Sequence, residues 1–279
     1  MPYIEISQSS APAVQLHYQD FGQGPPIVLI HGWPLSGRTW EAQVSHLVDA
    51  GYRVIAYDRR GFGASSQPWS GYDYDTLAGD LHELITVLKL EDVTLLGFSM
   101  GGGEVARYVG LYGTKTVRRA IFAAAVTPYL YQTKDNPEGA VTDQDIRAKE
   151  DAVLTDRLAF LEGFSKKFFT DATGHQWVSE PQREYARMIG AWASAKGSHD
   201  CIGAFSRTDF RADLQKFDIP TLVIHGDSDQ IVPLEVSGAR THKAIQGSRL
   251  HVIKNGPHGC NLSHAEEFNK AVLDFLKAG

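Results

Sequence analysis

The stretch Gly97-Phe98-Ser99-Met100-Gly101, extended by two further glycines, decides the fold of this chain. Residues 93–96 before it are apolar or β-branched, as in a buried strand, and residues 104–112 after it carry apolar side chains at helical spacing. Small residues two positions either side of a serine let the backbone turn sharply and project the hydroxyl from the strand end. The stretch predicts a strand–turn–helix unit with Ser99 as candidate nucleophile, against the alternative of an ordinary glycine-rich turn.

Short apolar runs alternate with amphipathic segments along most of the chain. The runs that we expect to be strands are residues 14–18, 27–30, 54–57, 93–96, 120–125, 221–224 and 250–253. The segments that we expect to be helices are residues 39–50, 75–90, 104–112, 233–245 and 264–276. This alternation requires crossover connections, so it predicts an α/β fold with a mostly parallel central sheet flanked by helices. Such sheets bind ligands beyond the carboxyl ends of their strands.

Residues 128–213 differ in texture from the rest of the chain. Strand-like runs disappear, and the segment is rich in aromatic side chains on helical stretches: Phe160, Phe164, Phe168, Phe169, Trp177, Tyr185, Trp192 and Phe205. We interpret the segment as a helical lid inserted into an α/β core that comprises residues 1–127 and 214–279. The alternative for most of these aromatic residues is that they form the core of the insertion itself.

The composition of the 279 residues is that of a globular protein, with 43% apolar and 22% charged residues. A net charge of −6 and the absence of a basic block argue against nucleic acid or an anionic membrane as partner. No apolar run approaches the roughly 20 residues that span a bilayer, and the N-terminal residues lack a signal-peptide pattern. We therefore expect a cytoplasmic protein. Cys201 and Cys260 have neither disulfide-framework nor metal-site spacing.

A serine hydroxyl needs a base, and one of the eleven histidines is placed to supply it. His258 lies in a loop directly after the strand expected at residues 250–253, so it belongs at the same sheet edge as Ser99. His31 and His225 each close a strand before a glycine, where a packed structural role is expected. The remaining histidines have no partner that the sequence identifies.

The base in turn needs an acid that orients it and stabilises its charged form. Asp227 and Asp229 both follow the strand expected at residues 221–224, and sequence logic leaves either open. The other position that such sheets use, after residues 120–125, holds Val126 and Thr127 instead. The resulting chain order Ser, Asp, His is the order of hydrolases with a nucleophile elbow.

Negative charge that develops on a substrate oxygen needs backbone N–H donors. Met100 follows the nucleophile and should supply one of them. The second should come from the loop after residues 27–30, where Pro34 has no N–H and leaves Trp33 as the candidate. The Trp33 ring is also a candidate wall of the acyl pocket.

Five motifs together resemble the α/β-hydrolase superfamily and, within it, the cofactor-free haloperoxidase (perhydrolase) and aryl esterase family. The motifs are His31-Gly32-Trp33-Pro34-Leu35, Asp58-Arg59-Arg60-Gly61-Phe62-Gly63-Ala64-Ser65, Gly97-Phe98-Ser99-Met100-Gly101-Gly102-Gly103, Asp209-Phe210-Arg211 and His225-Gly226-Asp227-Ser228-Asp229-Gln230-Ile231-Val232-Pro233. The resemblance implies these roles: nucleophile Ser99, acid Asp229, base His258, and oxyanion donors Trp33 and Met100. It also implies four pocket residues: Pro34, Val126, Phe205 and Ile231.

The resemblance implies a serine hydrolase that cleaves small carboxylic esters or lactones through an acyl-enzyme. Hydrogen peroxide in place of water would give a peracid, and Pro34 favours this reaction because proline restricts Trp33 and shifts its carbonyl. The expected partners are a small ester or acid, hydrogen peroxide and further copies of the chain; no cofactor or metal is expected. Cleavage of amides, lactams or carbon–carbon bonds stays open, as does a ligand receptor that retains the same residues.

Overall fold

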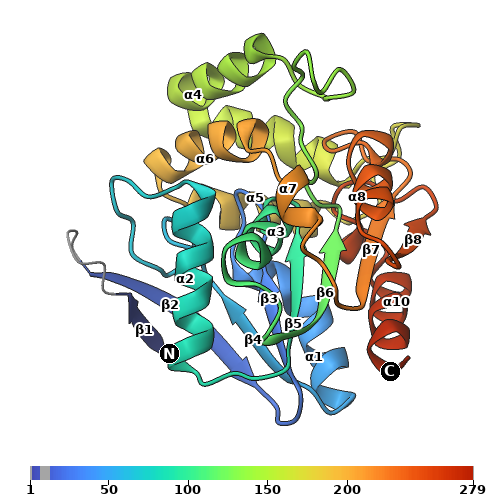
Figure 1. The fold of residues 1–279 in the computed structure, drawn as a ribbon. Coiled ribbons are helices and arrows are strands. Elements are labelled where there is room, and N and C mark those ends of the chain that lie inside the picture. The colour runs from blue at the N-terminus through green and yellow to red at the C-terminus, as the bar shows by residue number, and fades with distance from the viewer. Residues whose placement is uncertain (1, 7–12, 279) are drawn as a thin grey trace.

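Eight strands form one sheet in the order β1-β2-β4-β3-β5-β6-β7-β8 in the computed structural model, which describes residues 2–6 and 13–278 (Figure 1). The strands are β1 (Tyr3–Ile6), β2 (Val14–Phe21), β3 (Pro26–Ile30), β4 (Arg53–Tyr57), β5 (Val93–Phe98), β6 (Val117–Ala123), β7 (Thr221–Gly226) and β8 (Arg249–Ile253). Strand β2 pairs antiparallel with both β1 and β4, and all other pairs are parallel. The expected mostly parallel sheet is confirmed, with β1 as a strand that the sequence analysis did not include.

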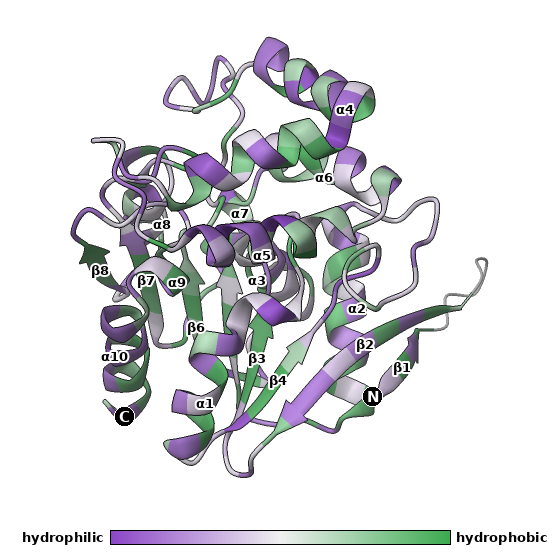
Figure 2. Ribbon diagram, turned by 180° about the vertical axis from the view of Figure 1, so that it is seen from behind, coloured by the Kyte–Doolittle hydropathy of each residue, from purple (hydrophilic) through white to green (hydrophobic). Residues whose placement is uncertain are grey.

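Helices cover both faces of the sheet. They are α1 (Glu41–Asp49), α2 (Tyr74–Val87), α3 (Met100–Tyr112), α8 (Gly238–Ala244), α9 (Cys260–Ser263) and α10 (Ala265–Lys277), with the short 3-10 helices η1 (Gly37–Trp40) and η2 (Leu234–Val236). Helices α2 and α3 lie in front of the sheet in Figure 1, and α1 and α10 lie in front of it in the reverse view of Figure 2. Within the described ranges, no helix has the length and apolarity needed to cross a membrane.

The sheet separates two apolar layers because successive side chains of a strand point to opposite faces. In β3, Val28 and Ile30 pack into the layer formed with α2 and α3, whereas Ile27 and Leu29 pack into the layer formed with α1 and α10. Figure 2 shows apolar strands at the centre and helices whose outer faces are polar. Strands buried on both sides explain why their sequences are uninterrupted apolar runs.

One expected helix is interrupted. The sequence predicts a helix over residues 233–245, but η2 and α8 are separated at Ser237, whose φ is −132° and ψ is −83°. The Ser237 hydroxyl donates a hydrogen bond to the carbonyl of Pro233 (2.7 Å) and stabilises the break. A Cβ at Gly238 would lie 2.5 Å from the His225 ring, so α8 begins where only glycine fits.

Four helices lie between β6 and β7, above the carboxyl ends of the strands (Figure 1). They are α4 (Asp143–Phe169), α5 (Glu180–Ala191), α6 (Ala195–Arg207) and α7 (Arg211–Leu214). Helix α4 bends at Asp156, which has φ −153° and ψ 88° and caps the second half by accepting from the Ala159 N–H (2.9 Å). That these helices act as a lid, with boundaries at residues 128 and 213, stays a prediction. Residues 1, 7–12 and 279 of the predicted core lie outside the described ranges.

Candidate active site

Ser99 occupies a strained turn between β5 and α3. Its φ of 53° and ψ of −117° lie in a region that residues with a side chain rarely adopt. The turn is tight because a Cβ on Gly97 would lie 2.4 Å from the Gly101 carbonyl oxygen, and one on Gly101 would lie 2.3 Å from that of Ile30. The Ser99 N–H donates to Ala123 (2.8 Å), which anchors the turn to the end of β6. The serine is thus fixed at the carboxyl edge of the sheet.

His258 and Asp229 continue from Ser99 in one line of hydrogen bonds. The His258 Nε2 lies 2.9 Å from the Ser99 Oγ, and the His258 Nδ1 lies 2.7 Å from the Asp229 Oδ2. An ionised carboxylate only accepts hydrogen bonds, so Nδ1 carries the proton and Nε2 is left to accept from the serine hydroxyl. The three side chains come from the ends of β5, β7 and β8, as the sequence analysis expected.

The Asp229 carboxylate is held in its ionised form. Burial alone would raise the pKa of this carboxyl, but the charge of His258 and hydrogen bonds from His225 and His258 outweigh it and lower the pKa below its ordinary value. The second oxygen, Oδ1, accepts from the N–H groups of Ile231 (2.8 Å) and Val232 (2.9 Å). The His225 Nε2 lies 3.3 Å from Oδ2 and 2.8 Å from the Val232 carbonyl oxygen, which requires the proton on that nitrogen.

Asp227, the other acid of the same loop, is exposed and points elsewhere. Its Oδ1 accepts from the Asn255 N–H (2.6 Å) and ties the loop after β7 to the loop after β8. The two aspartates that the sequence left open are therefore distinguished by geometry. The structure places Asp229, and not Asp227, against His258.

The backbone N–H groups of Trp33 and Met100 are both available as donors. Within residues 2–6 and 13–278, neither has a hydrogen-bond acceptor. Met100 is the first residue of α3, where N–H groups lack partners within the helix. The Trp33 indole donates to the Ser198 carbonyl (3.0 Å), so α6 fixes the ring. The structure thus leaves both predicted oxyanion donors unpaired beside Ser99.

A buried ion pair supports the loop that carries Trp33. The Arg59 Nε donates to Glu104 (2.7 Å), and the Arg59 guanidinium also donates to the His31 carbonyl (2.7 Å). The Tyr57 hydroxyl donates to the other Glu104 oxygen. The Arg59 N–H donates to the His31 Nε2 (3.0 Å), while burial and the Arg59 charge lower the pKa of His31 to about 3. His31 is therefore neutral, with Nδ1 donating to the Gly32 carbonyl (2.9 Å).

Sequence reasoning missed the roles of Arg59 and Glu104. It named Arg59 only as part of one motif and Glu104 only as part of an expected helix, because charged residues are mostly exposed. Both side chains are almost completely buried. One signal in the sequence could have identified Glu104: it is a charged residue in the first turns of a largely apolar helix, shortly after the nucleophile.

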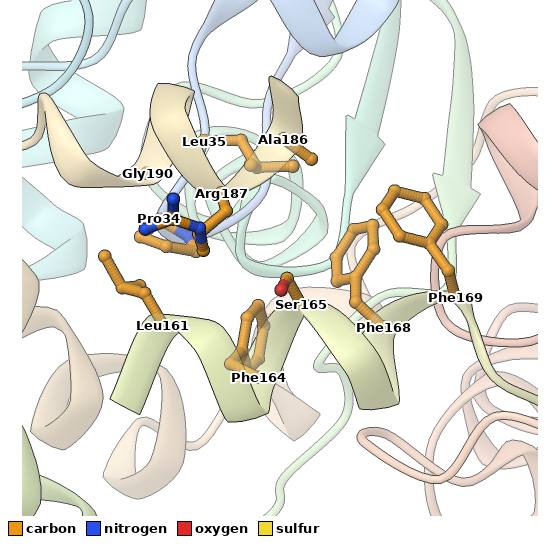
Figure 3. Close-up of a pocket in the computed structure, with 10 residues that line it drawn as sticks. All are labelled: Pro34, Leu35, Leu161, Phe164, Ser165, Phe168, Phe169, Ala186, Arg187 and Gly190. Atoms are coloured by element: carbon orange, nitrogen blue, oxygen red, sulfur yellow. The ribbon is translucent and has the colours of Figure 1, made fainter. Parts of the chain in front are cut away.

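A cavity of about 440 Å³ opens beside Ser99 and His258. Three predicted pocket residues, Val126, Phe205 and Ile231, lie in its lining together with Trp33. Pro34 does not: it lines a separate apolar pocket of about 10 Å³, where Figure 3 shows it facing Leu161 and α5. The physical reason is close packing on α5, since a Cβ on Gly190 would lie 3.1 Å from the Pro34 ring. No group of three or more potential metal-ligating side chains occurs in the described part of the chain.

Comparisons with known proteins agree with this geometry. The family described as alpha/beta hydrolase fold matches residues 25–265. The crystal structure of bromoperoxidase from Bacillus anthracis is 57% identical, with a TM-score of 0.95 over 99% of this chain and 100% of that chain. Non-heme chloroperoxidase CPO-A1 of Kitasatospora aureofaciens is 43% identical, over 94% of this chain and 96% of its own. Bifunctional esterase/perhydrolase DCH of Acinetobacter calcoaceticus is 35% identical, over 95% and 97% respectively. A match over most of the chain, together with this level of identity, establishes that the chain belongs to the alpha/beta hydrolase family of enzymes.

Proposed function

We propose that this protein is a serine hydrolase that cleaves small carboxylic esters or lactones through an acyl-enzyme. The observation that carries the proposal is the line of hydrogen bonds from Asp229 through His258 to Ser99, with distances of 2.7 and 2.9 Å. Its position beside a cavity with a largely apolar lining supports a small-molecule substrate. The relatives named as an esterase/perhydrolase and a chloroperoxidase support the same class of reaction.

In this proposal His258 takes the proton from Ser99 as the Oγ attacks the ester carbonyl carbon. The Trp33 and Met100 N–H groups stabilise the oxyanion of the tetrahedral intermediate. His258 then returns the proton to the leaving alcohol, and the acyl group remains on Ser99. Water, deprotonated by His258, attacks the acyl-enzyme and releases the acid. Asp229 orients His258 and stabilises its charged form throughout.

Hydrogen peroxide can replace water in the second half of this cycle. One peroxide oxygen attacks the acyl carbonyl carbon while His258 takes its proton. The bond from this carbon to the Ser99 Oγ then breaks, the peracid leaves, and His258 returns the proton to the serine. The peracid then transfers one oxygen atom, with its proton, to bromide, which gives hypobromous acid and the carboxylate. Pro34 supports this branch because proline restricts the preceding residue, and that residue is Trp33 at the oxyanion position.

The nucleophile is tested with Ser99→Ala and the substrate p-nitrophenyl acetate. We expect the variant to lose at least about 10³-fold in kcat, as for removal of a triad member. The matched control is Ser45→Ala, an exposed serine on α1. A fluorophosphonate probe should label the wild type and the control but not Ser99→Ala. Near-wild-type turnover by Ser99→Ala would overturn the assignment.

The peroxide branch is tested with acetate, hydrogen peroxide, bromide and a dye that is brominated by hypobromous acid. The wild type should brominate the dye only when acetate is present, and Ser99→Ala should not brominate it at all. Bromination by Ser99→Ala would show that halide oxidation bypasses the acyl-enzyme. Ester hydrolysis without bromination at any peroxide concentration would restrict the function to that of an esterase.

We also propose that the helices between β6 and β7 act as a lid, that the enzyme is cytoplasmic and that it self-associates. The lid is supported by α4 and α6, which supply part of the cavity lining. A reducing compartment fits the two free, buried cysteines, Cys201 and Cys260.

Family resemblance supports self-association, and light scattering after size-exclusion chromatography measures it. A monomer at all concentrations would contradict this part of the proposal.

A further inference from the structure

The cavity beside Ser99 combines apolar walls with a few polar side chains that the proposed reaction does not use. Its wall is formed mainly by apolar residues: Trp33, Val126, Leu130, Ala140, Val141, Phe160, Phe164, Ile202, Phe205, Ile231 and Val232. Two lysines, Lys149 and Lys167, also line it, as do Ser206 and Gln230. Two cations in the lining of a mostly apolar cavity need a physical explanation.

The bend of α4 is what brings both lysines to the same cavity. Lys149 lies before the bend at Asp156 and Lys167 lies after it. In a straight helix the two residues would stand about 27 Å apart along the axis. After the bend, Phe160, Phe164 and Lys167 follow one another at helical spacing and line the cavity together. Lys167 therefore belongs to the inner face of the helix, although it lies at the exposed rim.

Neither lysine forms an ion pair with another side chain of the described residues. Among the residues that the structure describes, no carboxylate lies within ion-pair distance of the ammonium group of Lys149 or Lys167. The neighbouring Lys166 differs, because it pairs with Glu162 at 3.0 Å. Burial lowers the pKa of Lys149, and the charge of Lys167 adds to this effect against the opposite influence of Asp145. The two ammonium groups thus repel each other, and a bound anion would relieve this repulsion.

Two acids near Lys149 in the chain, Asp145 and Glu150, already accept hydrogen bonds from other residues. The Asp145 carboxylate accepts hydrogen bonds from the N–H (2.8 Å) and the hydroxyl (2.6 Å) of Thr142, the N-cap residue of α4. Glu150 accepts from Arg207 on α6 at 2.9 Å. Within residues 2–6 and 13–278, the positive charge at the cavity therefore has no carboxylate in direct contact with it. The charge is available to a ligand.

Ser206 provides an independent observation at the same wall. Its side chain is 1% exposed, and its hydroxyl has no hydrogen-bond partner in the described ranges. The Arg207–Glu150 pair holds this end of α6 against the first half of α4, so the residues next to the pair, Ser206 and Lys149, come from adjoining helix segments. A buried hydroxyl without a partner costs free energy that a polar ligand group would recover.

We propose that the cavity binds esters or lactones whose acyl part ends in a carboxylate, such as half-esters of dicarboxylic acids. The carboxylate lies between Lys149 and Lys167, the Ser206 hydroxyl donates to it, and the apolar wall covers the methylene chain that leads to the carbonyl at Ser99. This inference rests on the proposed function, because it names the substrate class of that same site. The lysines are specificity-determining residues and take no part in bond breaking.

The test compares monomethyl adipate with methyl hexanoate, which differ in a terminal carboxylate against a methyl group. Hydrolysis is followed by titration of the released acid. The quantity compared is kcat/KM for monomethyl adipate divided by kcat/KM for methyl hexanoate. Lys149→Gln and Lys167→Gln should each lower this ratio about tenfold, as expected for the loss of one charge-assisted hydrogen bond. In the wild type, KM for monomethyl adipate should rise with ionic strength, because salt screens the attraction.

Lys166→Gln is the matched control. It removes the same charge at the residue next to Lys167, and the Lys166 side chain does not line the cavity. Its ratio should equal that of the wild type. A ratio that stays unchanged in both single variants and in the double variant Lys149→Gln/Lys167→Gln would overturn the inference. If the wild type hydrolyses neither ester, the proposed function fails; if it hydrolyses methyl hexanoate and the ratio does not respond, only the substrate class fails.

Discussion

The Asp229 carboxylate connects the loop after β7 to the loop after β8, and each of its two oxygens has a separate set of contacts. One oxygen receives His258 and the other receives the N–H groups of Ile231 and Val232. Removal of its charge should therefore affect His258 without opening the loop. This separates the role of Asp229 from that of Asp227, whose contact is with the backbone of Asn255.

Asp229→Asn should lower kcat for p-nitrophenyl acetate by about 10³- to 10⁴-fold, because a neutral amide cannot stabilise the charged histidine. Asp227→Asn is the control and keeps an oxygen that can accept from Asn255. We expect its kcat to stay within a few-fold of the wild type. Steady-state kinetics of both variants measure the difference, and a larger loss at Asp227 contradicts the assignment.

The same carboxylate should contribute to the pH dependence of stability. Its folded-state pKa lies below the ordinary value, because His258 and His225 outweigh the effect of burial. Its contribution is therefore fully present above the unfolded pKa of about 3.9 and is lost as the pH falls from there toward the folded pKa. Urea unfolding between about pH 5 and pH 3 should show a smaller fall in unfolding free energy for Asp229→Asn than for the wild type. Equal falls would exclude this contribution.

At the scale of elements, the Arg59–Glu104 pair links the end of β4 to α3 and to the loop after β3. Glu104→Gln leaves the buried Arg59 without its counter-charge and should lower the free energy of unfolding by about 3–5 kcal/mol. The comparison is Glu41→Gln, which removes the exposed partner of Arg38 and should change stability by less than about 1 kcal/mol. Urea unfolding measures both. Similar small effects would mean that the buried pair contributes little to holding these elements together.

The bend of α4 depends on a cap that can be removed separately. Asp156→Ala removes the acceptor of the Ala159 N–H and should destabilise the protein by about 1 kcal/mol. Asp156→Asn retains a good capping side chain and should stay within a few tenths of a kcal/mol of the wild type. Thermal unfolding of the two variants distinguishes loss of the cap from loss of charge. If the two variants lose stability equally, the capping explanation is wrong.

At the scale of the whole molecule, the sequence predicts most of the sheet and less of what covers it. Uninterrupted apolar runs identify strands that are buried on both faces, so β3 to β7 were expected. The edge strand β8 is more exposed, and residues 250–253 predicted it with a less regular pattern. Strand β1 has four residues, which is too short for a clear pattern. The bend of α4 carries no glycine or proline signal, because the residue at the bend is an aspartate that caps the second half of the helix.

The sequence likewise predicts one part of the candidate site and leaves another part open. Chain order and strand ends predict where Ser99, His258 and the acid loop should lie, since those positions follow from the parallel topology. The choice of Asp229 from the residues alone stayed open, because both aspartates share one loop and only tertiary contacts separate them. The direction of the Pro34 ring depends on α5, whose position the sequence does not supply.

The unusual backbone of Ser99 implies a trade-off between stability and activity for the whole protein. A serine at φ 53° and ψ −117° is held by its surroundings in a conformation that glycine adopts freely. Ser99→Gly and Ser99→Ala both lack the hydroxyl and differ in backbone freedom. Ser99→Gly should therefore be the more stable of the two inactive proteins, by about 1 kcal/mol in urea unfolding. The opposite order would mean that the turn holds no strain; the expected order would mean that selection for a reactive side chain has kept the molecule below the stability that its own fold allows.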